Sequence, residues 1–281
     1  KTPIFAQVDE KRIPAGKLSL AFPVIALSFG TENIINLSSE ARRSLLDWGL
    51  FHVEPTYLSL FKDYTKCLKQ RNILLRDKSS DNLDYWTNKL CVFGDEINIK
   101  RKEYFLRLLD QYAHLINQFS LDKEIDIYDD IKNTQISYYQ GWPNTLTMND
   151  AIIASIEKDR ALKYTTAGPH KADIVIEINN ELLKQTGSMS SQVITSLLMM
   201  LAQCQVFHME HGYRPILLID DLFFGIDDKN LRLVINLLRE LSAQCFLTAP
   251  DLYHEKLKSL NLEDKNTNIY KLTNGKIIQE E

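Results

Sequence analysis

Two adjacent carboxylates follow a short apolar run in the last third of the chain. The run Pro215–Ile219 leads directly into Asp220 and Asp221, as a buried parallel strand does when it delivers acid groups to its C-terminal edge. Carboxylates at such an edge can hold Mg²⁺ and orient a water, so the pattern is typical of the Walker B strand of phosphate-handling NTPases. The sequence therefore predicts a metal ligand at Asp220 and catalytic roles for Asp220 and Asp221.

The phosphate-binding loop that accompanies such a strand is absent from the sequence. No segment reads G-x-x-x-x-G-K-[ST], so the backbone N–H groups and the lysine that cradle β- and γ-phosphates are missing. The first residues, from Ile4 to Glu10, have the pattern of a strand that enters a turn. This pattern favours a start inside a fold whose upstream segment is missing, and the alternative is simple removal of an initiator Met. The same two carboxylates are also compatible with an ordinary solvated strand end, or with a stand-alone metal-dependent phosphohydrolase.

The bulk composition is that of an ordinary globular protein. The 281 residues are 44% hydrophobic and 25% charged, and the formal net charge is −4, so any contact with nucleic acid requires a local basic patch. The four cysteines are scattered without a C-x-x-C pair, which favours a reducing compartment over a disulfide framework. The sequence shows no signal peptide and no apolar run of transmembrane length. We therefore expect a cytoplasmic protein with no membrane partner.

The pattern of apolar residues predicts a helical excursion inside an α/β body. A helix is expected after Ser38, which supplies an N-cap, and apolar spacing predicts further helices at 57–78 and 97–119, with a weaker helix-compatible stretch at 83–95 that ends near Gly94. Successive helices of this length are typical of an antiparallel helical arm. We expect residues 49–162 to form this arm, and residues 1–48 and 163–281 to form the body.

The body has the signals of mixed α/β structure. A buried strand is expected at 21–28, a hairpin at 173–183, a buried helix at 192–210 and a closing hairpin at 269–278. The strand 216–219, a helix at 229–242 and a strand at 245–248 form a predicted βαβ unit with parallel pairing. Residues 135–140 have a β-like pattern, and residues 148–162 are predicted to be helical.

Several blocks, in the right order, resemble motifs of the bacterial RecF family. Residues 41–55 are similar to its "RR-x-FLDWG-x-FH-x-EP" block, residues 68–76 to "LKQRN-x-x-LR", and residues 168–173 to "GPH-[RK]-x-D". Leu218–Asp221 resembles its Walker B strand, Leu201–Gln203 the end of its signature helix, and Asp227 the Asp of its D-loop. The resemblance covers nearly the whole chain, apart from the phosphate loop, which in the family precedes the strand corresponding to Ile4–Val8.

The resemblance implies a fold and a function. The implied fold is α/β: part of an ABC-type ATPase head, related to the SMC and Rad50 heads, with an inserted antiparallel helical arm. Family members bind ATP and Mg²⁺ between two heads, dimerise on ATP, and bind DNA at gaps and single-strand/double-strand junctions without sequence preference. RecR is the implied partner, with RecO and RecA acting further along. This chain alone is expected to bind neither ATP nor Mg²⁺ well.

The signature and D-loop motifs depart from the family pattern. Ser188 aligns with the signature Ser and Gln192 with its Gln, whereas Ser190 replaces the signature Gly. A Cβ at that position could obstruct close approach to the γ-phosphate of the other head. Phe224 and Gly225 replace the Ser and Glu of the D-loop. The resemblance assigns Ser188, Ser190, Gln192 and Asp227 to nucleotide binding, and the departures favour an alternative: a non-hydrolysing relative that acts as a DNA- or RecR-binding scaffold.

Basic side chains are dense on two of the expected helices. The residues predicted to contact DNA are Lys62, Lys66, Lys69, Arg71, Arg76 and Lys102. Lysine and arginine at helical spacing can follow a phosphate backbone and give salt-sensitive, sequence-independent binding. The same pattern also occurs on ordinary solvated helices. Arg42 and Arg43 are interpreted as candidates for the head interface.

Overall fold

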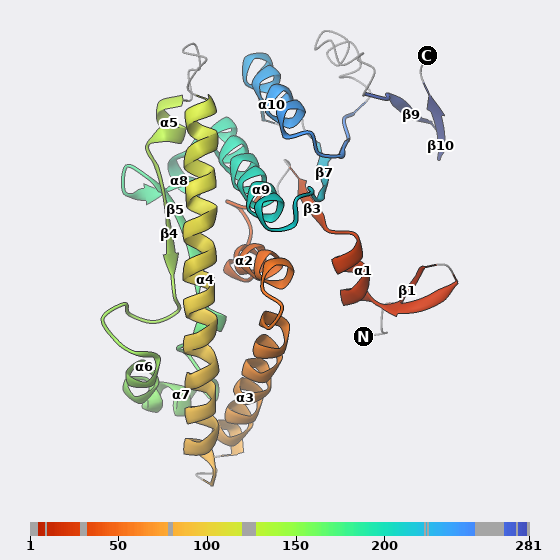
Figure 1. Cartoon of the computed structure of the whole chain (residues 1–281). Coiled ribbons are helices and arrows are strands. Elements are labelled where there is room, and N and C mark those ends of the chain that lie inside the picture. The colour runs from red at the N-terminus through yellow and green to blue at the C-terminus, as the bar shows by residue number, and fades with distance from the viewer. Residues whose placement is uncertain are drawn as a thin grey trace.

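The computed structural model describes residues 5–8, 10–28, 33–77, 81–119, 128–221, 223, 225–250, 267–273 and 275–279. Figure 1 shows a long bundle of helices flanked by small sheets, with the N- and C-terminal hairpins on the side away from the bundle. These hairpins are β1 (Phe5–Val8) with β2 (Lys11–Pro14), and β9 (Tyr270–Thr273) with β10 (Lys276–Gln279).

A three-stranded parallel sheet carries the two adjacent carboxylates. Its order is β3 (Val24–Ser28), β7 (Ile216–Asp220) and β8 (Cys245–Leu247), and Ser28 of β3 pairs with Asp220 of β7. Helix α10 (Asp228–Leu241) connects β7 to β8. The predicted βαβ unit is therefore confirmed, because a parallel pair needs such a crossover.

Helix α9 (Met189–His211) is the central helix of the hydrophobic core. It is long and apolar enough to cross a membrane by length and composition alone, but 83% of its most apolar window is buried inside the protein. It packs along α4 and also contacts α2 and β3. A helix that is apolar nearly all round is a core helix when its neighbours cover it on every side, so the prediction of a buried helix is confirmed.

A second, antiparallel sheet has the order β4 (Thr134–Tyr139), β5 (Asp173–Ile178) and β6 (Glu181–Leu182). The β5–β6 hairpin turns at Asn179 and Asn180, both with positive φ, as a tight turn of this type requires. Strand β4 pairs with β5 along its whole length. It comes from the predicted arm and β5 from the predicted body, so one sheet joins the two.

The helical bundle is built on three successive helices. They are α2 (Ser39–Val53), α3 (Tyr57–Asp77) and α4 (Leu83–Phe119). The predicted N-cap Ser38 accepts a hydrogen bond from the N–H of Ala41 at 3.3 Å. Helix α3 packs against the N-terminal part of α4 (Figure 1), as predicted for an antiparallel arm. The predicted boundary between residues 48 and 49 falls inside α2, and the division into arm and body stays a prediction.

Three details of the helix prediction are wrong. Helix α4 runs unbroken through Gly94, because this glycine is buried against Met148 and Tyr64, where the space leaves no room for a Cβ. The predicted helix at 148–162 is split at Ser155 into α6 (Met148–Ala154) and α7 (Ile156–Leu162). The strand predicted at 21–28 begins only at Val24, and residue 21 instead ends a helix that was not predicted, α1 (Ala15–Ala21).

The remaining short elements link these parts. Helix α5 (Tyr128–Lys132) precedes β4, the 3₁₀ turn η1 (Pro169–Lys171) precedes β5, and α8 (Leu183–Thr186) joins β6 to α9. The residues on which sequence predictions rest include three that lie outside the described residues. They are Ile4 of the first predicted strand, Phe224 of the D-loop and Asn274 in the turn of the predicted closing hairpin.

Gly49 of α2 tests how tightly the bundle is packed. A Cβ at this position would lie 2.0 Å from Cζ of the buried Tyr104 ring. We predict that Gly49→Ala lowers the free energy of unfolding by about 1–3 kcal/mol, although alanine is the better helix former. Gly16→Ala is the matched control, because a Cβ on this helical glycine meets nothing within 4 Å. Urea unfolding curves measure both, and an equal effect of the two substitutions would contradict the prediction.

Candidate functional site

The predicted catalytic carboxylates lie at the C-terminal edge of the parallel sheet. Asp220 ends β7 and accepts a hydrogen bond from the hydroxyl of Thr248, which follows β8. The same hydroxyl accepts the backbone N–H of Asp221 at 3.1 Å. Thr248 therefore connects the two carboxylate positions, and no feature of the sequence singled it out.

Asp221 has a backbone conformation that is unusual for its residue type. Its φ is +56°, in the left-handed region that non-glycine residues seldom adopt. The chain turns sharply here as it leaves β7, and the hydrogen bond to Thr248 holds the turn. The two side chains consequently do not follow the simple alternation of an extended strand.

The donor set at this edge fits Mg²⁺ but does not complete a site. Carboxylate and hydroxyl oxygens suit a hard cation that keeps several waters. Within the described ranges, no three His, Cys, Asp or Glu side chains gather closely enough to hold a metal ion. A cation at Asp220 would need further oxygens from a nucleotide and from water, as in an NTPase site.

Asp227 caps helix α10. Its carboxylate accepts the N–H groups of Lys229 at 3.0 Å and Asn230 at 2.9 Å, together with the side-chain amide of Asn230. Burial raises the pKa of this carboxyl, but the hydrogen bonds from Asn230 and Lys229 outweigh burial and hold the pKa below its usual value. An ionised carboxylate at a helix N-terminus stabilises the helix, so Asp227 fixes the direction in which the chain leaves the sheet edge.

The start of α9 contains the residues predicted to form the signature. Ser188 caps the helix by accepting the N–H of Ser191 at 3.1 Å. Ser190 donates its hydroxyl to the carbonyl of Gly225 at 2.8 Å. Gln192 is buried and bonds internally, to Gly187 and to Asn36. Of the predicted nucleotide-binding residues, Ser190 is thus in contact with the loop after β7, whereas Gln192 serves the local fold.

The contact between Ser190 and Gly225 joins two of the three positions that depart from the family pattern. Gly225 has φ +73°, and a Cβ there would lie 2.4 Å from Cγ of Met189. Glutamate at residue 225, as in the family's D-loop, would collide with the start of α9. The two departures are therefore mutually compatible in this chain.

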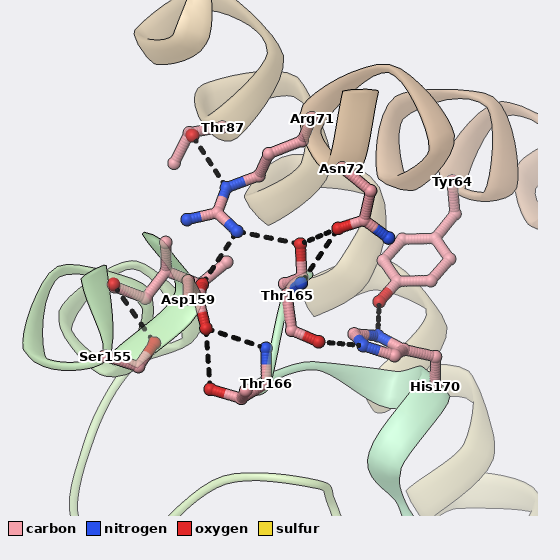
Figure 2. A network of polar contacts seen from close by, with 10 residues as sticks. Tyr64, Arg71, Asn72, Thr87, Ser155, Asp159, Thr165, Thr166 and His170 are labelled. Carbon is pink, nitrogen blue, oxygen red and sulfur yellow. Dashed lines mark hydrogen bonds and ion pairs between the residues drawn. The ribbon is translucent and has the colours of Figure 1, made fainter. Parts of the chain in front are cut away.

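Arg71, predicted to contact DNA, is fully buried. Its guanidinium pairs with Asp159 of α7 at 2.7 Å, and both side chains are 0% exposed. It also donates to Thr165 at 2.7 Å and to Thr87 of α4 at 3.0 Å (Figure 2). A phosphate cannot reach this group, so the assignment of Arg71 to DNA binding is wrong. A lone arginine in a basic helical run does not reveal a carboxylate partner 88 residues away.

Thr165 extends the Arg71 network toward the turn at 168–173. Asn72 accepts both the N–H and the hydroxyl of Thr165, at 2.8 and 2.7 Å. His170 bonds the carbonyl of Thr165 through Nε2 at 3.0 Å and the hydroxyl of Tyr64 through Nδ1 at 2.6 Å (Figure 2). Because a carbonyl only accepts, Nε2 carries the proton and the Tyr64 hydroxyl donates to Nδ1. Burial lowers the pKa of His170 to about 4, so the ring is neutral near pH 7.

Two arginines of α2 also form hydrogen bonds with the turn at residues 168–173. Arg42 forms a two-bond pair with Asp173, at 2.8 and 2.7 Å, and Arg43 donates to the carbonyl of Ala172 at 2.6 Å. Arg101 of α4 donates to the carbonyl of Pro169 at 2.7 Å. Arg42 and Arg43 were interpreted as candidates for a head interface. In the structure both donate hydrogen bonds to acceptors of the same chain.

The other predicted DNA contacts are exposed. Lys62, Lys66, Lys69 and Arg76 lie on α3 with their side chains in solvent, at positions that share one face of the helix. Lys102 of α4 is exposed but donates to Gln140 at 2.8 Å. Four of the six predicted residues therefore form one basic face.

Known proteins resemble this chain in sequence. It is 32% identical over 238 residues to the DNA replication and repair protein RecF of Xanthomonas axonopodis pv. citri, and 33% identical over 238 residues to that of Stenotrophomonas maltophilia; each match covers 84% of this chain. Over most of its length the chain is therefore RecF-like in sequence. No protein-family model matches it.

The fold agrees with this similarity. A solved structure of the recombination mediator protein RecF with ATP superposes with a TM-score of 0.73 at 20% identity, over 98% of this chain and 73% of that one. The chain therefore has the mixed α/β fold of that solved RecF structure. The chain spans 62% and 63% of the length of the two RecF relatives that it matches in sequence.

The RecF-like blocks of the sequence meet at one place in the fold. Arg42 comes from the first block, Arg71 and Asn72 from the second, and His170 and Asp173 from the third. Sequence reasoning missed the partners that complete this meeting point, because they carry no motif. These partners are Tyr64, Arg101, Asp159 and Thr165. Asp47, which pairs with Arg101, lies inside the first block.

The contribution of the buried ion pair between Arg71 and Asp159 to stability can be measured by removing one partner. We predict that Arg71→Met lowers the free energy of unfolding by about 3–5 kcal/mol, because it leaves Asp159 buried without its partner. The double variant Arg71→Met/Asp159→Leu should lose less than the single variant. The control is Arg160→Ala, which breaks an exposed pair with Glu157 and should cost at most about 0.5 kcal/mol. Equal losses for Arg71→Met and Arg160→Ala in urea unfolding would refute the prediction.

Proposed function

We propose that this chain acts as a RecF-type recombination mediator in DNA repair. The observation that carries the proposal is the match to named RecF proteins over 84% of the chain, together with a fold in which Asp220 and Asp221 occupy the C-terminal edge of a parallel sheet. In this proposal the full-length gene product binds Mg-ATP between two heads and dimerises on it. RecR is the direct partner, and the outcome is RecA loading at single-strand/double-strand junctions.

The proposed roles follow from where the residues lie. Asp220 would hold Mg²⁺, and Asp221 would orient the attacking water. The start of α9, with Ser188 and Ser190, would face the nucleotide held by the other head. When bound, Mg-ATP supplies the charge that joins the heads, while the chain's own residues hold the sheet edge and the α9 start in fixed positions.

A second candidate function is favoured by the contact between Ser190 and Gly225. The Ser190 hydroxyl is already bonded within the chain at 2.8 Å, and its Cβ occupies space where the family has Gly. A relative built in this way could dimerise or bind RecR and DNA without hydrolysing ATP. The two candidates differ in nucleotide turnover and share the DNA-binding face.

Nucleotide-dependent dimerisation separates these candidates. We predict that the full-length gene product sediments as a dimer with Mg-ATP and as a monomer without it. Asp221→Asn should keep the dimer and slow hydrolysis about a hundredfold, because only the water-orienting group changes. A dimer with no hydrolysis in the parent would favour the scaffold, and the absence of nucleotide binding would rule out the ATP-dependent step.

The basic face of α3 predicts salt-sensitive DNA binding. Replacing Lys62, Lys66, Lys69 and Arg76 with alanine should weaken binding to a gapped duplex. It should also reduce the slope of log affinity against log salt by about 0.9 for each phosphate that the protein no longer neutralises. The control variant Lys17→Ala/Lys184→Ala removes two exposed charges from other elements. Fluorescence anisotropy across a salt series measures both, and an unchanged slope in the α3 variant would exclude this face.

A further inference from the structure

Helix α4 exposes a row of large apolar side chains. Tyr85, Val92, Ile99 and Leu106 are 55%, 64%, 55% and 64% exposed. They follow one another at intervals of seven residues on a single helix, so they lie along one face. Scattered apolar residues on a surface need no explanation, but these four share one face of the helix, with polar side chains such as Asp95 and Lys102 between them. We call these four residues the α4 stripe.

The geometry of the α4 stripe matches that of a helix-docking seam. The stripe extends about 31 Å along α4, at 1.5 Å per residue. A seven-residue interval drifts slowly around a straight helix, and this drift is the pattern that a second helix follows when it supercoils around the first. At Leu106 the stripe meets a groove between α4 and α9 of about 310 Å³, which is lined by Leu106, Arg107, Asp110, Gln111, Val206 and Met209. Met209 is 66% exposed, so it extends the apolar surface onto α9.

One edge of the stripe is acidic. Glu96, Glu103 and Asp110 repeat at the same seven-residue interval, on the side that follows the stripe by four positions. Among the ion pairs of the described residues, none involves these three carboxylates. An unpaired acidic edge beside an apolar seam is complementary to basic flanking residues on a partner helix. It also repels phosphate, so the stripe does not suit DNA or an anionic membrane.

A second copy of this chain fits the stripe poorly. Antiparallel pairing about Ile99 would place Glu96 of one copy beside Glu103 of the other. Like charges across such an interface cost free energy, whereas a helix with lysine or arginine at the flanking positions meets opposite charge at Glu96, Glu103 and Asp110; beside Tyr85 the same edge carries Lys89.

We propose that the α4 stripe is a docking surface for a basic amphipathic α-helix of a partner protein. Apolar side chains of that helix would pack between Tyr85 and Leu106, its C- or N-terminal end would reach the groove at Met209, and its basic side chains would pair with the acidic edge. This surface lies apart from the Asp220 edge and from the basic face of α3. The proposal therefore does not depend on nucleotide or DNA binding.

A designed peptide tests the surface directly. The probe is a fluorescent helix of about four heptads, with leucine at the first and fourth heptad positions and lysine at the flanking positions. Its anisotropy is measured with the full chain. We expect saturable binding that Ile99→Glu weakens at least tenfold. Ile99 is 55% exposed, so this substitution leaves the fold intact, as circular dichroism should show. The matched control Ile277→Glu, at a 72% exposed isoleucine of β10, should bind like the parent.

Reversing the charge of the acidic edge tests whether its carboxylates pair with the basic side chains of the peptide. The variant Glu96→Lys/Glu103→Lys should lose affinity for the lysine peptide at least tenfold and gain affinity for a matched peptide with glutamate at the flanking positions. Equal binding of a scrambled peptide of the same composition would overturn the proposal, because it would show charge attraction alone. Sedimentation velocity provides the other decisive outcome: self-association of the parent that Ile99→Glu abolishes would assign the stripe to a second copy and overturn the proposal.

Discussion

Buried guanidinium groups must be neutralised, and this requirement organises the centre of the molecule. Arg71 and Arg101 are 0% and 1% exposed, and an arginine in such a place keeps its charge. Each therefore needs a carboxylate and further acceptors close by, since an uncompensated buried charge costs several kcal/mol. Asp159 neutralises Arg71, and Asp47 neutralises Arg101 with two bonds of 2.9 and 3.0 Å. Helices from distant parts of the sequence are thereby fixed to one another.

Several of the hydrogen bonds that satisfy arginines of the bundle converge on the turn at residues 168–173. It supplies carbonyl acceptors to arginines of α2 and α4, and the ring of His170 connects it to α3 through Tyr64. Gly168 has φ +137°, and a Cβ there would lie 2.7 Å from the Tyr64 hydroxyl, so this position needs glycine. The motifs that resemble the family most closely are therefore largely architectural. They hold the bundle against β5, and they leave the sheet edge at Asp220 as the place for chemistry.

Sequence alone predicted much of the fold, because periodicity and turn residues are local signals. It predicted the βαβ unit around Asp220, the buried helix α9 and the antiparallel bundle. It could not predict the burial of Arg71, since Asp159 lies far along the chain and has no motif. It also missed the path of α4 through Gly94, because the packing of Met148 that requires glycine is a tertiary property. At the site, Asp220 was found where expected, whereas Thr248, which joins it to Asp221, carries no signal that a single sequence reveals.

The unbroken course of α4 has a mechanical consequence. Its 37 residues form a rod of about 55 Å, packed against α9 at one end and against α3 toward the other. A rigid rod converts a small rotation at its base into a large translation at its tip: tilting α4 by about 5° moves its far end by about 5 Å over that length. Rearrangement of the core helix beside the parallel sheet would thus be transmitted, without any change in the rod itself, to the distant end of the bundle.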